Sequence, residues 1–183
     1  MEHALEHLSE ADTQVLARLR SAGEAWIVGG WARDSIIGRP DTDLDIATSL
    51  LPAEVKELFP RTLMVGEKYG TVVVRLDESV AGEPSWEVTT LRSEGTYGDG
   101  RRPDEVVFGS SIEDDLARRD FTINAIAIDA DGNRIDPHDG VADLRAGVLR
   151  SVGDARERLG EDGLRIMRAF RFLDSESGVR QME

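Results

Sequence analysis

Acidic residues at two-residue spacing occur in the stretch Asp41-Thr42-Asp43-Leu44-Asp45. If residues 43–46 form a β-strand, Asp43 and Asp45 face the same side of a sheet, roughly 6–7 Å apart along the strand. Carboxylates this close repel each other unless a cation lies between them. Mg²⁺ binds through one or two carboxylates and completes its shell with substrate phosphates, so the pair indicates phosphoryl-transfer chemistry. An acidic surface turn is the alternative interpretation.

A third carboxylate, Glu87, lies in a predicted strand over residues 86–91. Side chains alternate along a strand, so Glu87 and Thr89 share one face. Glu87 completes a carboxylate triad if this strand lies beside the first. Otherwise it is an ordinary solvent-facing residue.

A glycine pair stands where a predicted strand turns into a helix, in Gly29-Gly30-Trp31-Ala32-Arg33-Asp34. Glycines allow backbone N–H groups to approach a phosphate at the positive N-terminus of a helix. Arg33 could add the planar fork of donors that suits a phosphate. A tight turn followed by a surface arginine explains the same residues without a ligand.

Two further arginine groups follow downstream. Arg118 and Arg119 precede Asp120, a carboxylate that could orient a guanidinium or accept from a ribose hydroxyl. Asp162 and Arg165 are i, i+3 neighbours on a predicted helix, and they either pair with each other or face the edge of a base. Arg168 and Arg171 continue the same helix side. Arginines gathered in this way favour a bound anion.

The elements that must position these groups follow an α/β order. We expect helices over residues 3–20, 31–37, 52–59, 112–119 and 155–173. Strands are predicted over residues 25–28, 44–47, 63–76 with breaks at its glycines, and 86–91, and a hairpin pairs 126–129 with 133–135. Residues 93–104 form a polar, glycine-rich loop long enough to be functional.

Composition narrows the class of protein. The 183 residues contain no cysteine and no apolar run near the roughly 20 residues of a membrane span, so we expect a cytoplasmic protein with no membrane association. The formal net charge is −14, which argues against nucleic-acid binding through bulk charge. The net charge does not exclude local anion sites, because 20 of the 22 basic residues are arginine, whose side chain binds phosphates well.

Taken in order, these motifs resemble the catalytic head of class II tRNA nucleotidyltransferases and bacterial poly(A) polymerases. The resemblance rests on the segments named above together with several others: residues 66–71 (GEKYGT), 87–92 (EVTTLR), 101–103 (RRP), 118–125 (RRDFTINA), Asp136-Pro137, Asp139-Gly140 and 161–172. It implies an α/β polymerase-beta-like palm, with a mixed sheet and flanking helices, followed by the start of a helical neck. The implied domains are an N-terminal helix over 1–22, the nucleotidyltransferase head over 23–150, and the neck over 151–183.

The resemblance also implies an activity: Mg²⁺-dependent addition of CMP and AMP from CTP and ATP to an RNA 3′ end, with release of pyrophosphate. Asp43 and Asp45 would hold two metal ions, and Glu87 would orient or deprotonate the RNA hydroxyl. Gly29, Gly30 and Arg33 would contact the triphosphate. The remaining nucleotide contacts would be Arg119 and Asp120 to the ribose, Asp162 and Arg165 to the base edge, and Arg168 and Arg171 to the helix or the phosphates.

Among members of this family, residues 66–71 and the full-length loop 93–104 favour a CCA- or A-adding enzyme of tRNA. The alternatives are a bacterial poly(A) polymerase, or a catalytically weak nucleotide-binding head that needs a partner chain. A metal-dependent phosphohydrolase is a third hypothesis, but it leaves RRDFTINA and EDGLR (residues 161–165) unexplained. The resemblance implies that residues 151–183 are only the start of the neck and contain the helix that templates the nucleotide. Family members continue beyond this helix, so we expect this sequence to lack the rest of the neck, the body and the tail. Leu164, Met167 and Phe170 are then expected to lack cover.

Overall fold

The computed structural model describes residues 4–38, 43–65, 70–76, 84–94, 106–109, 111–173 and 181–182. Several sequence features lie outside these residues: Asp41 and Thr42, most of the 66–71 motif, residues 95–104 of the polar loop, including Arg101–Pro103, and residues 174–180. Within the described part, no helix is long and apolar enough to cross a membrane.

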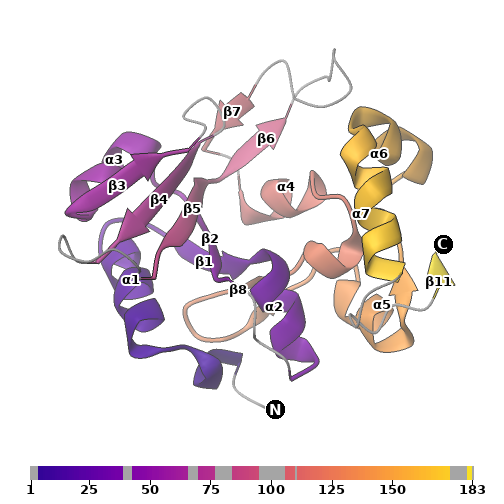
Figure 1. Ribbon diagram of the computed structural model, residues 1–183, viewed down its shortest axis with the longest axis horizontal. Helices are drawn as coiled ribbons and strands as arrows, with labels where there is room; N and C mark the ends of the chain where they lie inside the picture. Colours follow the sequence, from indigo (N-terminus) through magenta and orange to yellow (C-terminus); the bar gives the residue numbers. More distant parts are fainter. Residues whose placement is uncertain are drawn as a thin grey trace.

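A mixed sheet forms the centre of the molecule (Figure 1). Within the described residues it has seven strands in the order β3-β4-β5-β2-β1-β8-β9. β2 and β5 pair in parallel, and the other neighbours pair antiparallel. The strands are β1 (Ala25–Val28), β2 (Asp45–Thr48), β3 (Arg61–Met64), β4 (Thr71–Arg75), β5 (Trp86–Thr90), β8 (Ala127–Ile128) and β9 (Arg134–Ile135). The predicted α/β palm with a mixed sheet is confirmed.

Helices flank the sheet, and short strand pairs lie at its margins (Figure 1). The helices are η1 (Ala4–His7), α1 (Glu10–Arg20), α2 (Gly29–Ile36), α3 (Pro52–Leu58), α4 (Ile112–Ala117), η3 (Thr122–Asn124), α5 (Gly140–Ala146), α6 (Ala155–Glu161) and α7 (Gly163–Leu173). β6 (Arg92–Glu94) pairs with β7 (Val106–Phe108) at the base of the polar loop, and β10 (Val148–Leu149) pairs with β11 (Gln181–Met182).

One face of the sheet packs against α1 and α3 to form the main core. The buried alternate residues of β4, Val72 and Val74, join Val15 and Leu16 of α1 and Val55 of α3 in this cluster. The other residues of β4 therefore lie on the opposite face of the sheet, because side chains alternate. That opposite face carries the candidate site.

A second core attaches the C-terminal helix to the domain. Phe121 and Ile123 pack with Leu144 of α5 and with Ala169 and Phe172 of α7. The rings of Phe121 and Phe172 meet edge to face, with centroids 5.8 Å apart. This cluster holds α7 beside η3 and α5.

Two helix predictions need correction. The helix expected over residues 3–20 is divided, because Ser9 caps α1 by accepting from the Asp12 N–H at 3.1 Å and so separates α1 from η1. The helix expected over 155–173 is divided at Asp162, whose extended backbone (φ −145°, ψ 112°) ends α6 before α7 begins. α5 was not predicted at all.

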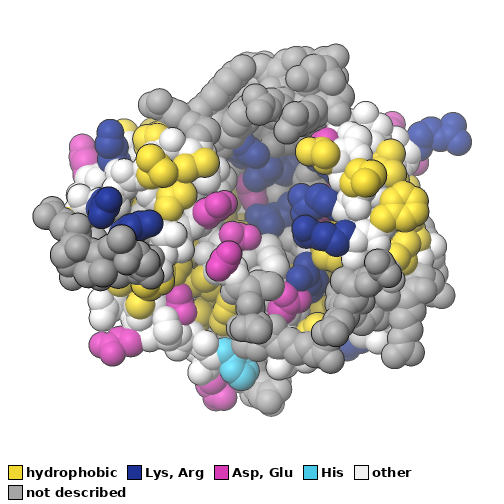
Figure 2. All heavy atoms as spheres, viewed as in Figure 1, with side chains coloured by type: hydrophobic (Ala, Val, Ile, Leu, Met, Phe, Trp, Pro, Cys, Tyr) yellow, Lys and Arg dark blue, Asp and Glu magenta, His cyan; other side chains and the backbone are white. Residues whose placement is uncertain are grey.

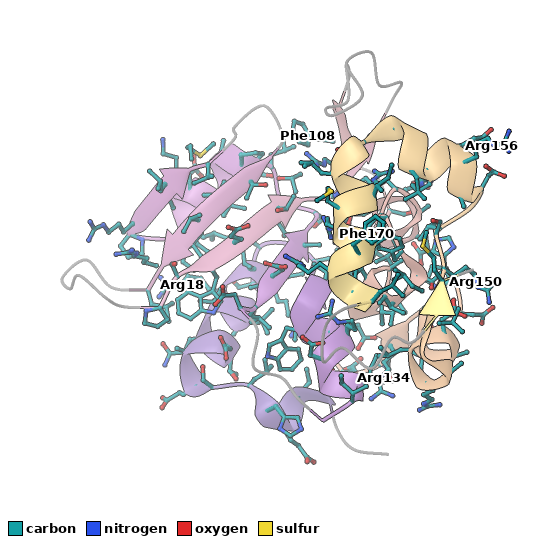
Figure 3. The ribbon with its side chains drawn as sticks, turned by 45° about the vertical axis from the view of Figure 1, so that its right-hand side comes forward. Arg18, Phe108, Arg134, Arg150, Arg156 and Phe170 are labelled. Carbon is teal, nitrogen blue, oxygen red and sulfur yellow. The ribbon has the colours of Figure 1, made fainter. Side chains whose placement is uncertain are left out.

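The outer face of α7 is apolar and exposed, as the sequence predicts. Leu164, Met167 and Phe170 are 50%, 66% and 65% exposed, respectively. Figure 2 shows a hydrophobic patch on this side of the molecule, and Figure 3 shows Phe170 on α7.

Candidate active site

The three predicted carboxylates come together at one hollow in the open face of the sheet. Asp45 begins β2 and pairs in register with Glu87 on the neighbouring parallel strand β5. Asp43 stands two residues earlier, before the strand rather than in it as predicted. Asp43, Asp45 and Glu87, together with Val73, Pro84 and Ser85, line a hollow of about 410 Å³. The structure therefore brings Glu87 to the same hollow as the two aspartates, and the roles of the three carboxylates stay predictions.

Crowding of like charges sets the electrostatics of Asp45. Burial and the neighbouring Glu87 carboxylate raise the pKa of Asp45 to about 6 from its ordinary 3.8, and Asp43 adds to the shift. Arg119 and Arg168 act in the opposite direction, so both guanidinium groups are near enough for their charge to reach Asp45. A divalent cation would relieve this repulsion, because it favours the ionised form of every carboxylate around it.

The donor set fits Mg²⁺ in character. The hollow offers carboxylate oxygens, the ligands that Mg²⁺ prefers. Among the described residues, no group of three or more His, Cys, Asp or Glu side chains is placed so that it could hold a metal ion. Mg²⁺ bound through two carboxylates, with water and substrate phosphates as its other ligands, needs no third protein side chain.

The glycine pair lies against the carboxylates. β1 ends at Val28 and α2 begins at once with Gly29, which has φ +72°, a conformation that favours glycine. A Cβ on Gly29 would lie 2.6 Å from Oδ2 of Asp45. The first turn of α2 has no side-chain cap, so its N–H groups remain suited to an anion.

Arg33 is engaged by protein groups. Its Nε and Nη2 donate to the two carboxylate oxygens of Asp34 at 2.7 and 2.8 Å, and its Nη1 donates to Oδ1 of Asn124 at 2.9 Å. The guanidinium also lies over the Phe172 ring, 5.2 Å from the centroid. Arg33 thus joins α2 to η3 and α7, and its contact with a triphosphate stays a prediction.

Arg119 is positioned by a buried carboxylate, Asp115, which the sequence analysis did not identify. Asp115 of α4 is 1% exposed and accepts from Arg118 at 2.7 Å and from Arg119 at 3.1 Å. Burial alone would raise the pKa of Asp115, but the two arginines hold it below its usual value. Its sequence spacing could have identified it, because Asp115 stands three and four residues before the two arginines. Side chains at these separations meet on a helical turn.

Asp120 is an internal partner as well as a candidate ribose acceptor. Its Oδ1 accepts from the Phe121 N–H at 2.8 Å and from Nδ2 of Asn124 at 3.1 Å. Its Oδ2 lies 3.0 Å from Nε of Arg168, an ion pair between the end of α4 and α7. The residue is 5% exposed and Oδ2 is itself buried, so the contact of Asp120 with a ribose stays a prediction.

The two residues predicted to read a base edge have local structural partners. Asp162 accepts from the Leu164 N–H at 2.9 Å and so begins α7. Arg165 is 8% exposed, pairs with Glu161, and donates to the Arg158 carbonyl at 2.8 Å and the Arg118 carbonyl at 3.2 Å. Arg171 lies over the Phe172 ring. Base reading by Asp162 and Arg165 stays a prediction.

The site as a whole has one acidic and one basic wall. Figure 2 shows acidic side chains gathered on the sheet side of a central depression, with lysine or arginine side chains facing them from the side of α7. Such an arrangement suits a metal-bound polyphosphate, whose cation meets the carboxylates while its oxygens meet the guanidinium groups.

Comparisons with known proteins show which family and fold the chain resembles. A family model described as "Poly A polymerase head domain" matches residues 25–150. CCA-adding enzymes of Latilactobacillus sakei and Lactiplantibacillus plantarum are 53% identical over 170 residues and 51% identical over 164 residues, covering 92% and 89% of this chain. The matches cover 41% and 39% of those proteins, so the chain spans about two fifths of the length of these relatives.

Solved structures show the same fold. The Bacillus stearothermophilus CCA-adding enzyme in complex with CTP matches all of this chain and 42% of its own, with a TM-score of 0.82 and 40% identity. The Thermotoga maritima CCA-adding enzyme complexed with tRNA matches with a TM-score of 0.74 and 26% identity, again over all of this chain and 42% of its own.

Proposed function

The chain belongs to the poly A polymerase head domain family, and from this premise we propose that it is the catalytic head of an enzyme that adds CMP and AMP to the 3′ end of tRNA. One observation carries the proposal. The register of β2 with β5 sets Asp45 beside Glu87, in a hollow that Asp43 also lines.

The carboxylates have distinct proposed roles. Asp43 and Asp45 would hold two Mg²⁺ ions, which supply positive charge at the reacting phosphate when bound. Glu87 would orient the RNA 3′-hydroxyl and accept its proton. The hydroxyl oxygen forms a bond to the α-phosphorus of the nucleotide, the bond from that phosphorus to the bridging oxygen breaks, and pyrophosphate leaves with the electron pair.

The basic wall would bind the nucleotide. Arg119 and Arg168 carry positive charge within reach of Asp45, which supports their contact with the triphosphate. The uncapped first turn at Gly29 and Gly30 supports a further phosphate contact there. Asp120 would accept from the ribose through the oxygen that Arg168 also contacts.

Base selection by Arg165 would require this side chain to change its hydrogen-bond partners. For Arg165 to meet a base edge, its fork must leave Glu161 and the Arg118 carbonyl. Nucleotide binding would therefore be accompanied by a change in the partners of Arg165 between α4, α6 and α7. Asp162 needs a smaller change, because it is Oδ1 that accepts from the Leu164 N–H at the start of α7.

A tRNA acceptor is favoured over poly(A) synthesis by the relatives. The curated proteins at about half identity are CCA-adding enzymes, and solved relatives are described in complex with CTP and with tRNA. A poly(A) polymerase would use ATP alone and a less specific RNA end, so nucleotide and acceptor choice distinguish the two.

The test is transfer of label from α-labelled CTP or ATP, with Mg²⁺, to tRNA lacking CCA, to tRNA ending in CC, and to oligo(A). We expect incorporation into both tRNA acceptors, with CTP used on the first and ATP on the second. Asp43→Ala and Asp45→Ala should each abolish it, whereas Glu57→Gln, on the exposed side of α3, removes one charge without loss.

Label on oligo(A) from ATP alone would identify a poly(A) polymerase instead. Incorporation that appears only after addition of the C-terminal three fifths of a relative would identify a head that requires a partner. Retained activity in either aspartate variant would refute the assignment of these carboxylates.

A further inference from the structure

The open face of the sheet continues past the carboxylates onto β4 and β3. Val72 and Val74 of β4 are fully buried in the main core, so Thr71, Val73 and Arg75 lie on the face of Glu87. The register confirms this row, because Val73 pairs with Glu87 on one side and with Leu63 of β3 on the other.

A second hollow adjoins the first on this face. It has a volume of about 350 Å³ and is lined by Arg61, Thr62, Leu63, Val73 and Arg75. Val73 lines both hollows, so the second opens beside the carboxylate site and not on a separate part of the surface.

Two arginines flank this second hollow. Arg61 and Arg75 are directly opposed across the antiparallel pair β3–β4. Opposed residues in such a pair have Cβ atoms about 4.5–5.5 Å apart, so both side chains can reach one ligand. Guanidinium groups bind phosphate oxygens bidentately, and a hollow lined by two of them therefore suits an anion.

An exposed apolar side chain stands next to the arginines. Leu63 is 64% exposed although it lies in a strand, and it occupies the same face as Arg61. A basic groove with an apolar platform is the combination that binds a single-stranded nucleic acid, with phosphates on the cations and a base or ribose on the platform.

The location of the second hollow indicates which of the two anionic substrates, the nucleotide triphosphate or the RNA strand, it would bind. Strand spacing sets Arg75 and Arg61 about 8 and 12 Å, respectively, from Glu87 along the sheet. The basic groups whose field reaches Asp45 are Arg119 and Arg168, which lie outside this sheet face and suit the triphosphate. The β3–β4 face is therefore available to the polymer that continues away from the reacting hydroxyl.

We propose that Arg61, Leu63 and Arg75 form the docking surface for the single-stranded RNA 3′ end, with the two arginines on backbone phosphates upstream of the reacting hydroxyl. This inference rests on the proposed function, because it says where on the enzyme the RNA that accepts the nucleotide would lie. Because the net charge of this chain is −14, any contact that it makes with RNA phosphates needs a locally basic surface of this kind.

The test compares Arg61→Gln/Arg75→Gln with a matched control, Arg134→Gln/Arg145→Gln, which removes the same charge from exposed positions on β9 and α5. Binding of a short fluorescein-labelled single-stranded RNA ending in CC is measured by anisotropy between 50 and 200 mM salt, and CTP binding by calorimetry. Circular dichroism confirms folding of each variant.

We expect RNA affinity to fall about ten- to thirtyfold at 0.1 M salt, with a salt slope lower by about 1.4, as for two lost phosphate contacts on a single strand. The control should match the wild type, and CTP affinity should stay within twofold in both. Leu63→Glu, at an exposed position that tolerates substitution, should weaken RNA binding in the same direction.

RNA affinity equal to that of the control would overturn the docking surface, as would wild-type protein that does not bind RNA. A parallel loss of CTP affinity would overturn it too, since the arginines would then serve the triphosphate. Incorporation in the label-transfer assay separates the two proposals. If RNA binding depends on Arg61 and Arg75 but no nucleotide is added, the docking surface stands and the proposed activity of this chain fails.

Discussion

Replacing Asp45 by asparagine should stabilise the metal-free protein at neutral pH while it abolishes nucleotide addition. Burial and the Glu87 carboxylate raise the pKa of Asp45 to about 6, so the ionised form is disfavoured in the fold. Asparagine is nearly the same size and carries no charge. The substitution therefore removes the repulsion and leaves the packing in place.

The size of this gain in unfolding free energy follows from the linkage between proton binding and folding. Between the ordinary pKa of 3.8 and the folded value of about 6, the folded protein binds more protons than the unfolded chain, so stability falls as pH rises through this window. Each pKa unit corresponds to about 1.4 kcal/mol, which gives an upper value of about 3 kcal/mol above pH 6. Well below pH 3.8 the aspartate is neutral in both states, and the advantage of asparagine disappears.

The assay is urea unfolding of wild type and Asp45→Asn in EDTA at several values between pH 4 and pH 8. We expect the difference in unfolding free energy to grow from near zero to about 2–3 kcal/mol in favour of the variant. Glu57→Gln should stay within about 0.5 kcal/mol of wild type across the range, as a surface substitution does. Added Mg²⁺ at pH 7.5 should raise the stability of wild type and not of Asp45→Asn.

A difference that does not change with pH would refute the reasoning, and so would an asparagine variant that is less stable at pH 7.5. Either result would mean that crowding of carboxylates does not destabilise this site. A Mg²⁺ response that survives in the variant would show that the cation is held elsewhere.

Two further substitutions test how the site is positioned. Gly29→Ala should cost more than about 1 kcal/mol in urea unfolding and lower the rate of nucleotide addition, because the backbone is left-handed there and the new Cβ would meet the Asp45 carboxylate at 2.6 Å. An unchanged rate would remove Gly29 from the site. Asp115→Ala should cost about 3–5 kcal/mol, since it leaves two half-buried guanidinium groups without their shared carboxylate. Asp115→Glu is the comparison variant, and a loss below 1 kcal/mol for alanine would show that the two arginines have equivalent partners elsewhere.

The elements of the fold that the sequence predicts well are those with strong local signals. β1 is a short apolar run, β5 has its apolar residues Trp86 and Val88 at alternate positions, and β8 and β9 form a hairpin around Asp131-Gly132. α5 was missed because its start depends on a contact outside the helix. Both oxygens of Asp136 accept from the first N–H groups of α5, at Gly140 and Val141, and at 2.7 and 2.9 Å. A Cβ on Gly140 would lie 2.1 Å from the Thr122 carbonyl oxygen, a constraint that no local pattern contains.

The candidate site also combines features with a local sequence signal and features that depend on long-range contacts. Residue type and spacing made Asp43, Asp45 and Glu87 candidates, because carboxylate repulsion and strand alternation are local properties, and the family resemblance supplied their predicted roles. The partners of the arginines are set by the tertiary structure. Arg33 meets Asn124, 91 positions away, and Arg165 meets a carbonyl 47 positions away.

These long-range contacts give the basic wall a second role that its sequence motifs do not suggest. Arg33, Arg165 and Arg168 each join elements from different parts of the chain, through Asn124, the Arg118 carbonyl and Asp120. A guanidinium group that already has protein partners loses little conformational entropy when a phosphate or base binds, but it must exchange a hydrogen bond to do so. The proposed nucleotide contacts are therefore tied to the packing of α2, α4 and α7. Because the same side chains would bind the ligand and join these helices, nucleotide binding and the position of α7 should be coupled in this domain.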